Sequence, residues 1–260
     1  MITLKNISKT VRGNKLLFEN VNITFNAGQR YALTGPNGCG KSTLLKILMG
    51  MDDATGGGVV RPKKIGYLRQ NIEDFHEYTL LDTTIMGNKY LWSAFEERDR
   101  IYEKPEITDQ DGIRLAEIEE IIADENGYEA DSEAASLLSG MLIEEEFHDK
   151  KMSELPSDVQ FKVLLCQALF GAPQALILDE PTNHLDMNSI VWLEKFLKTY
   201  PGTVIFTSHD KNFLNNLSTM TADIDYDTII MYPGNYDNML LMKTTLRRKS
   251  EKENASKQKK

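Results

Sequence analysis

The sequence has no long apolar segment. None of its apolar runs approaches the roughly 18 residues that a membrane-spanning helix needs, and residues 1–5 show no basic segment followed by a long apolar one. Its two cysteines, Cys39 and Cys166, are too few and too far apart for a disulfide-stabilised scaffold. We therefore expect a cytoplasmic protein with reduced thiols, without a secretory signal and without a membrane span.

Positive charge is scarce over most of the 260 residues, and the formal net charge is −9. Contacts to nucleic-acid phosphates need Lys and Arg, so the chain as a whole is a poor general binder of nucleic acid. Residues 243–260 are the exception, with eight Lys or Arg against two Glu. Composition alone favours a solvated end for this basic segment. The alternative is the start of a linker that touches RNA.

The hydrophobic pattern predicts an α/β fold. Apolar residues alternate in the expected strands 2–7 and 18–25, and shorter apolar runs predict buried strands at 30–34, 175–178 and 203–207. Helical periodicity follows in 42–49, 161–170 and 190–197. The glycines of residues 56–58 are expected to break the chain before further strands at 59–60 and 64–68. We find no internal repeat.

The middle of the chain has a different character. Glu, Arg, Tyr and long aliphatic residues dominate, and the stretches 93–102 and 113–123 predict amphipathic helices separated by Pro105. This pattern predicts an inserted helical unit at about residues 86–130.

A glycine-rich segment follows the expected strand 30–34 and opens the expected helix 42–49, which is the context that supports a phosphate loop. Glycines let successive backbone N–H groups turn inward around a phosphate, and the helix N-terminus adds favourable partial charge. We expect ATP here, with Lys41 at the β- and γ-phosphates, Ser42 on Mg²⁺ and Thr43 near a phosphate. The segment fits the Walker A pattern and reads Gly35, Pro36, Asn37, Gly38, Cys39, Gly40, Lys41 and Ser42.

Two carboxylates, Asp179 and Glu180, end the expected strand 175–178. Asp179 suits the coordination of Mg²⁺, and Glu180 suits a general base that polarises the attacking water. His209 ends the next expected strand, where it can reach the γ-phosphate, and Gln70 follows strand 64–68, where it can contact Mg²⁺ or water. A lone His is usually structural, so these assignments depend on the Walker A segment.

Together these motifs resemble those of the ABC ATPases. Two further segments are typical of the ABC-F family, whose members carry two ABC domains in one chain and no membrane part. They are Asp-Glu-Pro-Thr-Asn-His-Leu-Asp at residues 179–186 and Tyr-Pro-Gly-Asn-Tyr-Asp at residues 232–237. The resemblance implies a P-loop NTPase core of the ABC type, with an antiparallel β flank, a helical subdomain and a helical arm insertion.

The same resemblance implies a domain plan and partners. Residues 1–242 are expected to form the ABC domain, with the arm at about 86–130, and residues 243–260 to begin a basic interdomain linker. A second ABC domain is expected to follow. ABC-F proteins bind the ribosome in the ATP state, so the arm and linker are expected to contact rRNA and tRNA.

One stretch departs from the family pattern. In an ABC pair each ATP lies between one Walker A segment and the partner's signature motif, normally Leu-Ser-Gly-Gly-Gln. Here residues 155–160 read Leu-Pro-Ser-Asp-Val-Gln, so that Pro156 replaces Ser and Asp158 replaces a Gly. A carboxylate repels a γ-phosphate, and Pro lacks a donor. We expect the site on Lys41 to hydrolyse ATP with a partner's sound signature, and the opposite site to be slow.

The expected contact with adenine also departs from the family pattern. ABC domains usually stack the base on an aromatic residue, and Arg12 occupies that position here. Its guanidinium can stack on a base, or it can be a solvated side chain with adenine held by apolar contacts. Cys39 inside the loop is either a reactive thiol that ATP protects or an inert small filler.

Three functions fit these motifs. The first is a ribosome-associated ABC-F ATPase that acts in translation. The second is the ATPase subunit of a membrane transporter, which does not explain the basic segment. The third is a nucleotide-binding regulatory module with little turnover, which the altered signature supports.

Overall fold

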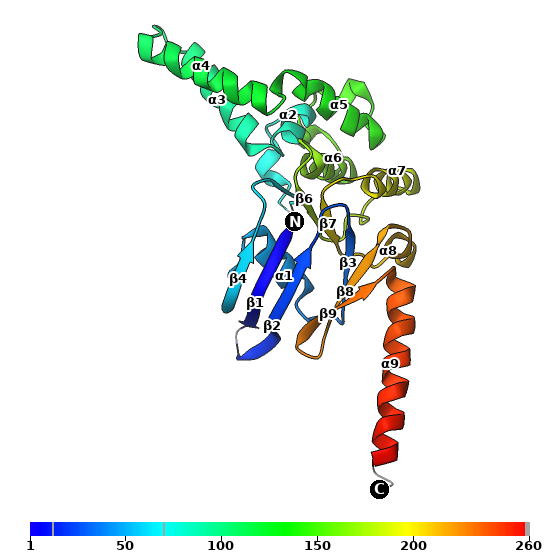
Figure 1. Ribbon diagram of the computed structural model, residues 1–260. Coiled ribbons are helices and arrows are strands. Elements are labelled where there is room, and N and C mark those ends of the chain that lie inside the picture. Colours follow the sequence, from blue (N-terminus) through cyan, green and yellow to red (C-terminus); the bar gives the residue numbers. More distant parts are fainter. Residues whose placement is uncertain (12, 70, 258–260) are drawn as a thin grey trace. The chain divides into compact units, whose positions relative to one another are not determined.

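Two sheets carry the phosphate loop and its neighbours (Figure 1). The computed structural model describes residues 1–11, 13–69 and 71–257, with side chains up to residue 246. Its backbone divides into two units. Unit 1 comprises Met1–Ile65, Gln174–Asn183 and Glu194–Lys260, and unit 2 comprises Gly66–Pro173 and His184–Leu193.

The first sheet of unit 1 is antiparallel, in the order β2-β1-β4. Its strands are β1 (Ile2–Val11), β2 (Lys15–Phe25) and β4 (Gly56–Val60). The predicted chain break at residues 56–58 is wrong, because these glycines pair with β1. Gly57 has φ 80°, and a Cβ there would collide with the backbone of Asn6. Glycine is therefore needed for the close approach of two strands.

The second sheet of unit 1 is mainly parallel, in the order β6-β7-β3-β8-β9. Every residue of β6 and β7 is buried, as continuous apolar runs in parallel strands predict. The chain enters unit 2 within β5 (Ile65–Tyr67). The strands are β3 (Arg30–Thr34), β6 (Ala175–Leu178), β7 (Thr203–Phe206), β8 (Met220–Asp225) and β9 (Thr228–Pro233).

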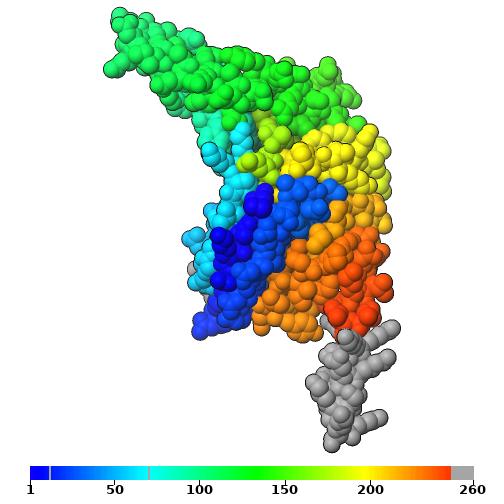
Figure 2. Space-filling view, in the orientation of Figure 1, coloured from blue at the N-terminus to red at the C-terminus, as the bar shows by residue number. Residues whose placement is uncertain are grey.

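Strands β8 and β9 form a hairpin that the hydrophobic pattern did not predict. Its two-residue turn is Tyr226-Asp227, and both residues have positive φ, which matches a tight hairpin turn. The turn meets β2, because the Glu19 amide donates to the Asp227 carbonyl over 2.9 Å. Figure 2 shows the blue N-terminal strands lying against the orange residues of this hairpin.

Four helices complete unit 1 or reach into it. The buried residues of α1 (Lys41–Met49) are Leu44, Leu45, Ile47 and Leu48, the apolar face that the sequence predicts. Helix α7 (Met187–Lys198) crosses the boundary between the units. Helix α8 (Lys211–Leu217) is capped by Asp210 and packs against α9 (Tyr236–Lys257), which contains most of the basic segment.

Unit 2 is helical. Helices α2, α5 and α6 pack on one another, and α3 packs against α4. Side chains cap the starts of α2, α3 and α4, and Thr108 and Asp111 form a reciprocal capping box at α4. The helices are α2 (Leu80–Ile85), α3 (Lys89–Tyr102), α4 (Asp109–Asp124), α5 (Ala130–Gly140) and α6 (Ser157–Leu169).

Candidate nucleotide-binding site

The loop of residues 35–40 joins β3 to α1, as the sequence predicts. Gly35 has φ 142°, and a Cβ there would lie 2.7 Å from the Cys39 Sγ and 2.7 Å from the Ile224 carbonyl oxygen. Strand β8 is therefore pressed against the start of the loop. Only glycine fits this position without displacing the backbone of β8.

The start of α1 has the character of an anion site. Its N-cap is Gly40, which supplies no side-chain acceptor, and the first turn holds no acidic residue. The free N–H groups and the positive end of the helix thus face the loop, and Ser42 and Thr43 lie in this turn. The Lys41 ammonium donates to the loop carbonyls of Gly35 at 2.8 Å and Pro36 at 3.2 Å. Its charge is held at the centre of the loop.

The acid pair at the end of β6 is organised by a residue that the motif analysis missed. The Thr207 hydroxyl donates to Asp179 Oδ1 over 2.6 Å and accepts the Glu180 amide over 2.9 Å. Thr207 is only 1% exposed. A polar residue at the end of a buried apolar strand was the signal that could have revealed it.

Glu180 and His209 meet directly. The His209 amide donates to Glu180 Oε2 over 3.0 Å, and the His209 Nε2 lies 3.6 Å from Oε1. Glu180 has φ 52°, a left-handed conformation that costs a non-glycine residue free energy and is frequent at functional sites. The His209 side chain is 77% exposed, so its ring remains accessible to a ligand.

The loop and the acid pair share one edge of the sheet. Phe206 of β7 is paired with Ala32 of β3 on one side and with Leu178 of β6 on the other. The three strands are parallel, so their carboxyl ends lead into the phosphate loop, the acid pair and the Thr207–His209 segment side by side. Ligands of open α/β sheets bind at such an edge.

The donor set at this edge suits Mg²⁺. Within the described part of the chain, no group of three or more His, Cys, Asp or Glu side chains forms a metal cage. Mg²⁺ in nucleotide sites typically takes one or two protein oxygens together with phosphate oxygens. Asp179 and Ser42 offer such oxygens. Gln70, the third expected ligand, and Arg12, the expected adenine contact, lie outside the described residues.

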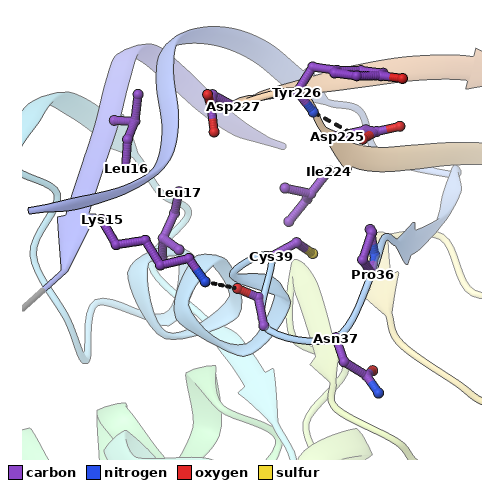
Figure 3. A pocket seen from close by; sticks show the side chains of 11 residues that line it. Lys15, Leu16, Leu17, Pro36, Asn37, Cys39, Ile224, Asp225, Tyr226 and Asp227 are labelled. Atoms are coloured by element: carbon purple, nitrogen blue, oxygen red, sulfur yellow. Dashed lines mark hydrogen bonds between the residues drawn. The ribbon is translucent and has the colours of Figure 1, made fainter.

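A pocket of about 220 Å³ adjoins the loop (Figure 3). Its lining comes from residues 15–17 of β2, residues 36–39 of the loop and residues 224–227 of the β8–β9 hairpin. The Lys15 ammonium donates to the Gly38 carbonyl over 3.1 Å and ties β2 to the loop. Cys39 lines this pocket with partial exposure.

The altered signature stretch belongs to unit 2. Pro156 is the N-cap of α6 and gives it no side-chain hydrogen bond, and Asp158 stands in the first turn. Gln160 is buried, and its amide donates to the carbonyls of Met152 at 2.6 Å and Leu155 at 2.9 Å. This glutamine therefore stabilises the turn of residues 152–155 that precedes α6.

Unit 2 also contains the end of the Asp-Glu-Pro-Thr-Asn-His-Leu-Asp segment. The Lys162 ammonium of α6 donates to Asp186 over 2.6 Å, and Asp186 accepts the Ser189 amide at the start of α7. These bonds hold the pKa of Asp186 well below its usual range. The His184 ring packs on Phe161 with centroids 5.6 Å apart. The end of the motif segment, residues 184–186, is thus fixed to the helix that begins at the signature stretch.

Comparison with known proteins decides the family. The family model described as ABC transporter matches residues 18–183, which is more than half of the chain. The chain belongs to this family. It is an ATP-binding ABC domain, and hydrolysis of ATP is the activity expected of it. Among the described residues, none of the helices is both long and apolar enough to span a membrane.

Several curated relatives are similar over nearly all of the chain. It is 49% identical to the uncharacterized ABC transporter ATP-binding protein YkpA of Bacillus subtilis (strain 168), with 91% of this chain and 44% of YkpA covered. It is 46% identical to the probable ATP-binding protein YbiT of Escherichia coli O157:H7, with 94% of this chain and 47% of YbiT covered. The Energy-dependent translational throttle protein EttA of Escherichia coli (strain K12) is 32% identical, with 93% and 44% covered.

The chain therefore spans about half the length of these relatives. Among solved structures, the dimeric ADP- and phosphate-bound ATP-binding cassette MJ0796 matches with a TM-score of 0.63 at 22% identity, covering 90% of this chain and 98% of that one. A nucleotide-free ATP-binding cassette of an ABC transporter matches with a TM-score of 0.63 at 19% identity, covering 92% of this chain and 93% of that one. These likenesses confirm the predicted fold class.

Replacement of Thr207 tests the organisation of the acid pair. Thr207→Val keeps the shape of the side chain but removes the hydroxyl that orients Asp179. In the wild type, Mg²⁺ should raise ATP affinity by some factor, and in Thr207→Val we expect this factor to be about ten times smaller. Removing a hydrogen-bond partner of a metal ligand typically has an effect of this size. Calorimetric titration of ATP with and without Mg²⁺ measures the difference.

Thr207→Ser is the matched control, because it keeps the hydroxyl and should retain the Mg²⁺ effect. An unchanged Mg²⁺ effect in Thr207→Val would contradict the role of Thr207.

Proposed function

We propose that the chain is the ATP-binding half of an ABC-F ATPase of the YbiT type, which acts on the ribosome in translation. The observation that carries the ATPase is the shared sheet edge, where Lys41, Asp179, Glu180 and His209 follow three paired parallel strands. The translational role is supported by the 32% identity with EttA, which is named as a translational throttle protein. Ribosomes lie in the cytoplasm, so the proposal places the protein there.

In this proposal, different residues of the chain bind the phosphates, hold Mg²⁺ and activate the attacking water. Lys41 and the loop N–H groups hold the β- and γ-phosphates, and Ser42, Asp179 and Gln70 hold Mg²⁺, with Thr43 beside a phosphate. The metal ion, when bound, neutralises developing charge on the phosphates. The remaining loop residues, Pro36, Asn37, Gly38, Cys39 and Gly40 together with Gly35, shape the cradle.

Glu180 accepts the proton of the attacking water, and His209 contacts the γ-phosphate. The hydrogen bond from the His209 amide to the Glu180 carboxylate keeps both groups at one position on the sheet edge. The pocket between residues 15–17 and 224–227 receives the nucleoside, with Arg12 as a further candidate for the base. Hydrolysis requires a second ABC domain, because the partner supplies a signature motif to this ATP.

The domain plan is part of the proposal. Residues 1–242 form the ABC domain, and helices α3 and α4 lie inside the expected arm at about 86–130. Residues 243–260 begin the linker, and residues 243–257 belong to helix α9. RNA phosphates attract this basic segment, whereas α4 carries six acidic residues and one Arg. The proposal assigns contacts with rRNA and tRNA to the linker and the arm. The linker supplies the net positive charge, because the three basic residues of α3 are matched by three acidic ones.

The ribosomal role is tested by co-sedimentation of the full-length protein with ribosomes. Glu180→Gln, with the matching change in the second ABC domain, should trap the ATP-bound state and give at least tenfold more ribosome-bound protein with ATP than with ADP. Glu144→Gln, an exposed residue with the same change of charge, should behave like the wild type. The assay measures the bound fraction in the pellet.

Absence of ribosome binding by a Glu180→Gln variant that demonstrably holds ATP would contradict the ribosomal role. That outcome would favour the ATPase subunit of a membrane transporter, which the matching family model and the similar transporter cassettes make the second candidate.

The signature stretch gives an independent prediction. Pro156→Ser combined with Asp158→Gly restores a hydroxyl and removes a carboxylate at the start of α6. We expect faster ATP turnover at the partner site, by about tenfold, because a repulsive charge beside a γ-phosphate is removed. Steady-state phosphate release by the two-domain protein measures it, with Asp149→Gly as an exposed control. Unchanged turnover would contradict the idea that the altered signature slows the partner site.

A further inference from the structure

Lys243 is an unusual residue in an otherwise exposed part of helix α9. Its neighbours Met242 and Thr244 are exposed, but the Lys243 side chain is only 22% exposed. Its ammonium lies 2.6 Å from Asp223 Oδ2 and 2.5 Å from Asp225 Oδ2, both on strand β8. One cation from the C-terminal helix thus faces two carboxylates, of which Asp223 is almost completely buried.

This triad lies directly behind the phosphate loop. The hydroxyl of Thr34, the residue before the loop, donates to Asp223 Oδ1 over 3.0 Å. Ile224, between the two aspartates, approaches Gly35 so closely that a Cβ on Gly35 would collide with it. Asp225 lines the pocket that residues 36–39 of the loop also line. Asp223 therefore contacts the residue that precedes the phosphate loop, and Asp225 lines the pocket beside that loop.

The ammonium is charged at neutral pH. Burial lowers the pKa of Lys243, but its hydrogen bonds to Asp223 and Asp225 raise it, and the pKa is raised overall. The triad thus sets one cation against two carboxylates. Removal of Lys243 would leave the carboxylates without this cation at little-exposed positions, where solvent screens poorly and an ionised carboxylate repels a phosphate.

We propose that Lys243 is a determinant of ATP affinity that acts through Asp223 and Asp225. It is a positioning residue: its ammonium neutralises and fixes two carboxylates that otherwise repel the triphosphate. Binding free energies are reciprocal, so ATP in turn stabilises the docking of α9 on the β8–β9 hairpin. The first residues of the basic segment are thereby coupled to the nucleotide. The proposal rests on the assignment of ATP to the phosphate loop.

The test is the ATP affinity of the full-length protein measured by calorimetry at low salt. Lys243→Met should weaken ATP binding about tenfold, which corresponds to about 1.4 kcal/mol, and the loss should shrink at high salt. Lys243→Arg keeps the charge and should retain most of the affinity. Lys195→Met, which removes an exposed Lys from α7, is the matched control and should have no effect.

A triple variant separates charge from folding. Asp223→Asn with Asp225→Asn and Lys243→Met removes all three charges, and the amide oxygen introduced by Asp223→Asn can still accept the Thr34 hydroxyl. Restored ATP affinity in the triple variant would support the proposal even if Lys243→Met alone folds poorly. Unchanged affinity in Lys243→Met, or a triple variant no better than Lys243→Met, would overturn it.

Lys41→Ala distinguishes this proposal from the assignment of the site. Loss of ATP binding in Lys41→Ala together with no effect of Lys243→Met would overturn the triad alone. ATP affinity unchanged by Lys41→Ala would overturn both, because the nucleotide would then not lie on the loop.

Discussion

The pairing of β7 with β3 and with β6 is the constraint on which the candidate site depends. Phe206 stands between Ala32 and Leu178, so three chain segments that are far apart in sequence end at one edge. Each segment adds a different chemistry at that edge: a cation in a glycine loop, an acid pair, and a hydroxyl followed by a histidine. Thr207 connects the second and third of these segments, because its one hydroxyl is bonded to both the Asp179 carboxylate and the Glu180 amide.

Strand β8 contacts the phosphate loop and carries the two carboxylates that pair with Lys243. It approaches Gly35 closely, presents Asp223 to Thr34 and presents Asp225 to the pocket beside the loop. Because Lys243 pairs with both carboxylates, helix α9 contributes charge next to the nucleotide site, although Lys243 lies after all the recognised motifs. The nucleotide and the basic segment are thus joined through one hairpin.

The sequence predicted the parts of the site that depend on local chain geometry. The loop, the strand before it, the helix after it and the acid pair were predicted because glycine spacing, apolar periodicity and continuous apolar runs are local signals. The roles of Thr207 and Lys243 were not predicted, because their partners are 28 and 20 residues away and pairing across strands leaves no periodic trace. The glycines of β4 were misread as a break. The sequence does not show that Gly57 is needed because the backbone of Asn6 on the neighbouring strand approaches it closely.

The central claim is that one sheet edge both binds ATP and hydrolyses it, through different residues. The most direct test measures ATP affinity and steady-state hydrolysis in the same preparations of Lys41→Ala and Glu180→Gln. The account predicts that Lys41→Ala loses affinity, whereas Glu180→Gln keeps it and loses at least a hundredfold in turnover, as expected for a missing general base. Equal loss of affinity in both variants, or undiminished turnover in Glu180→Gln, would contradict the account.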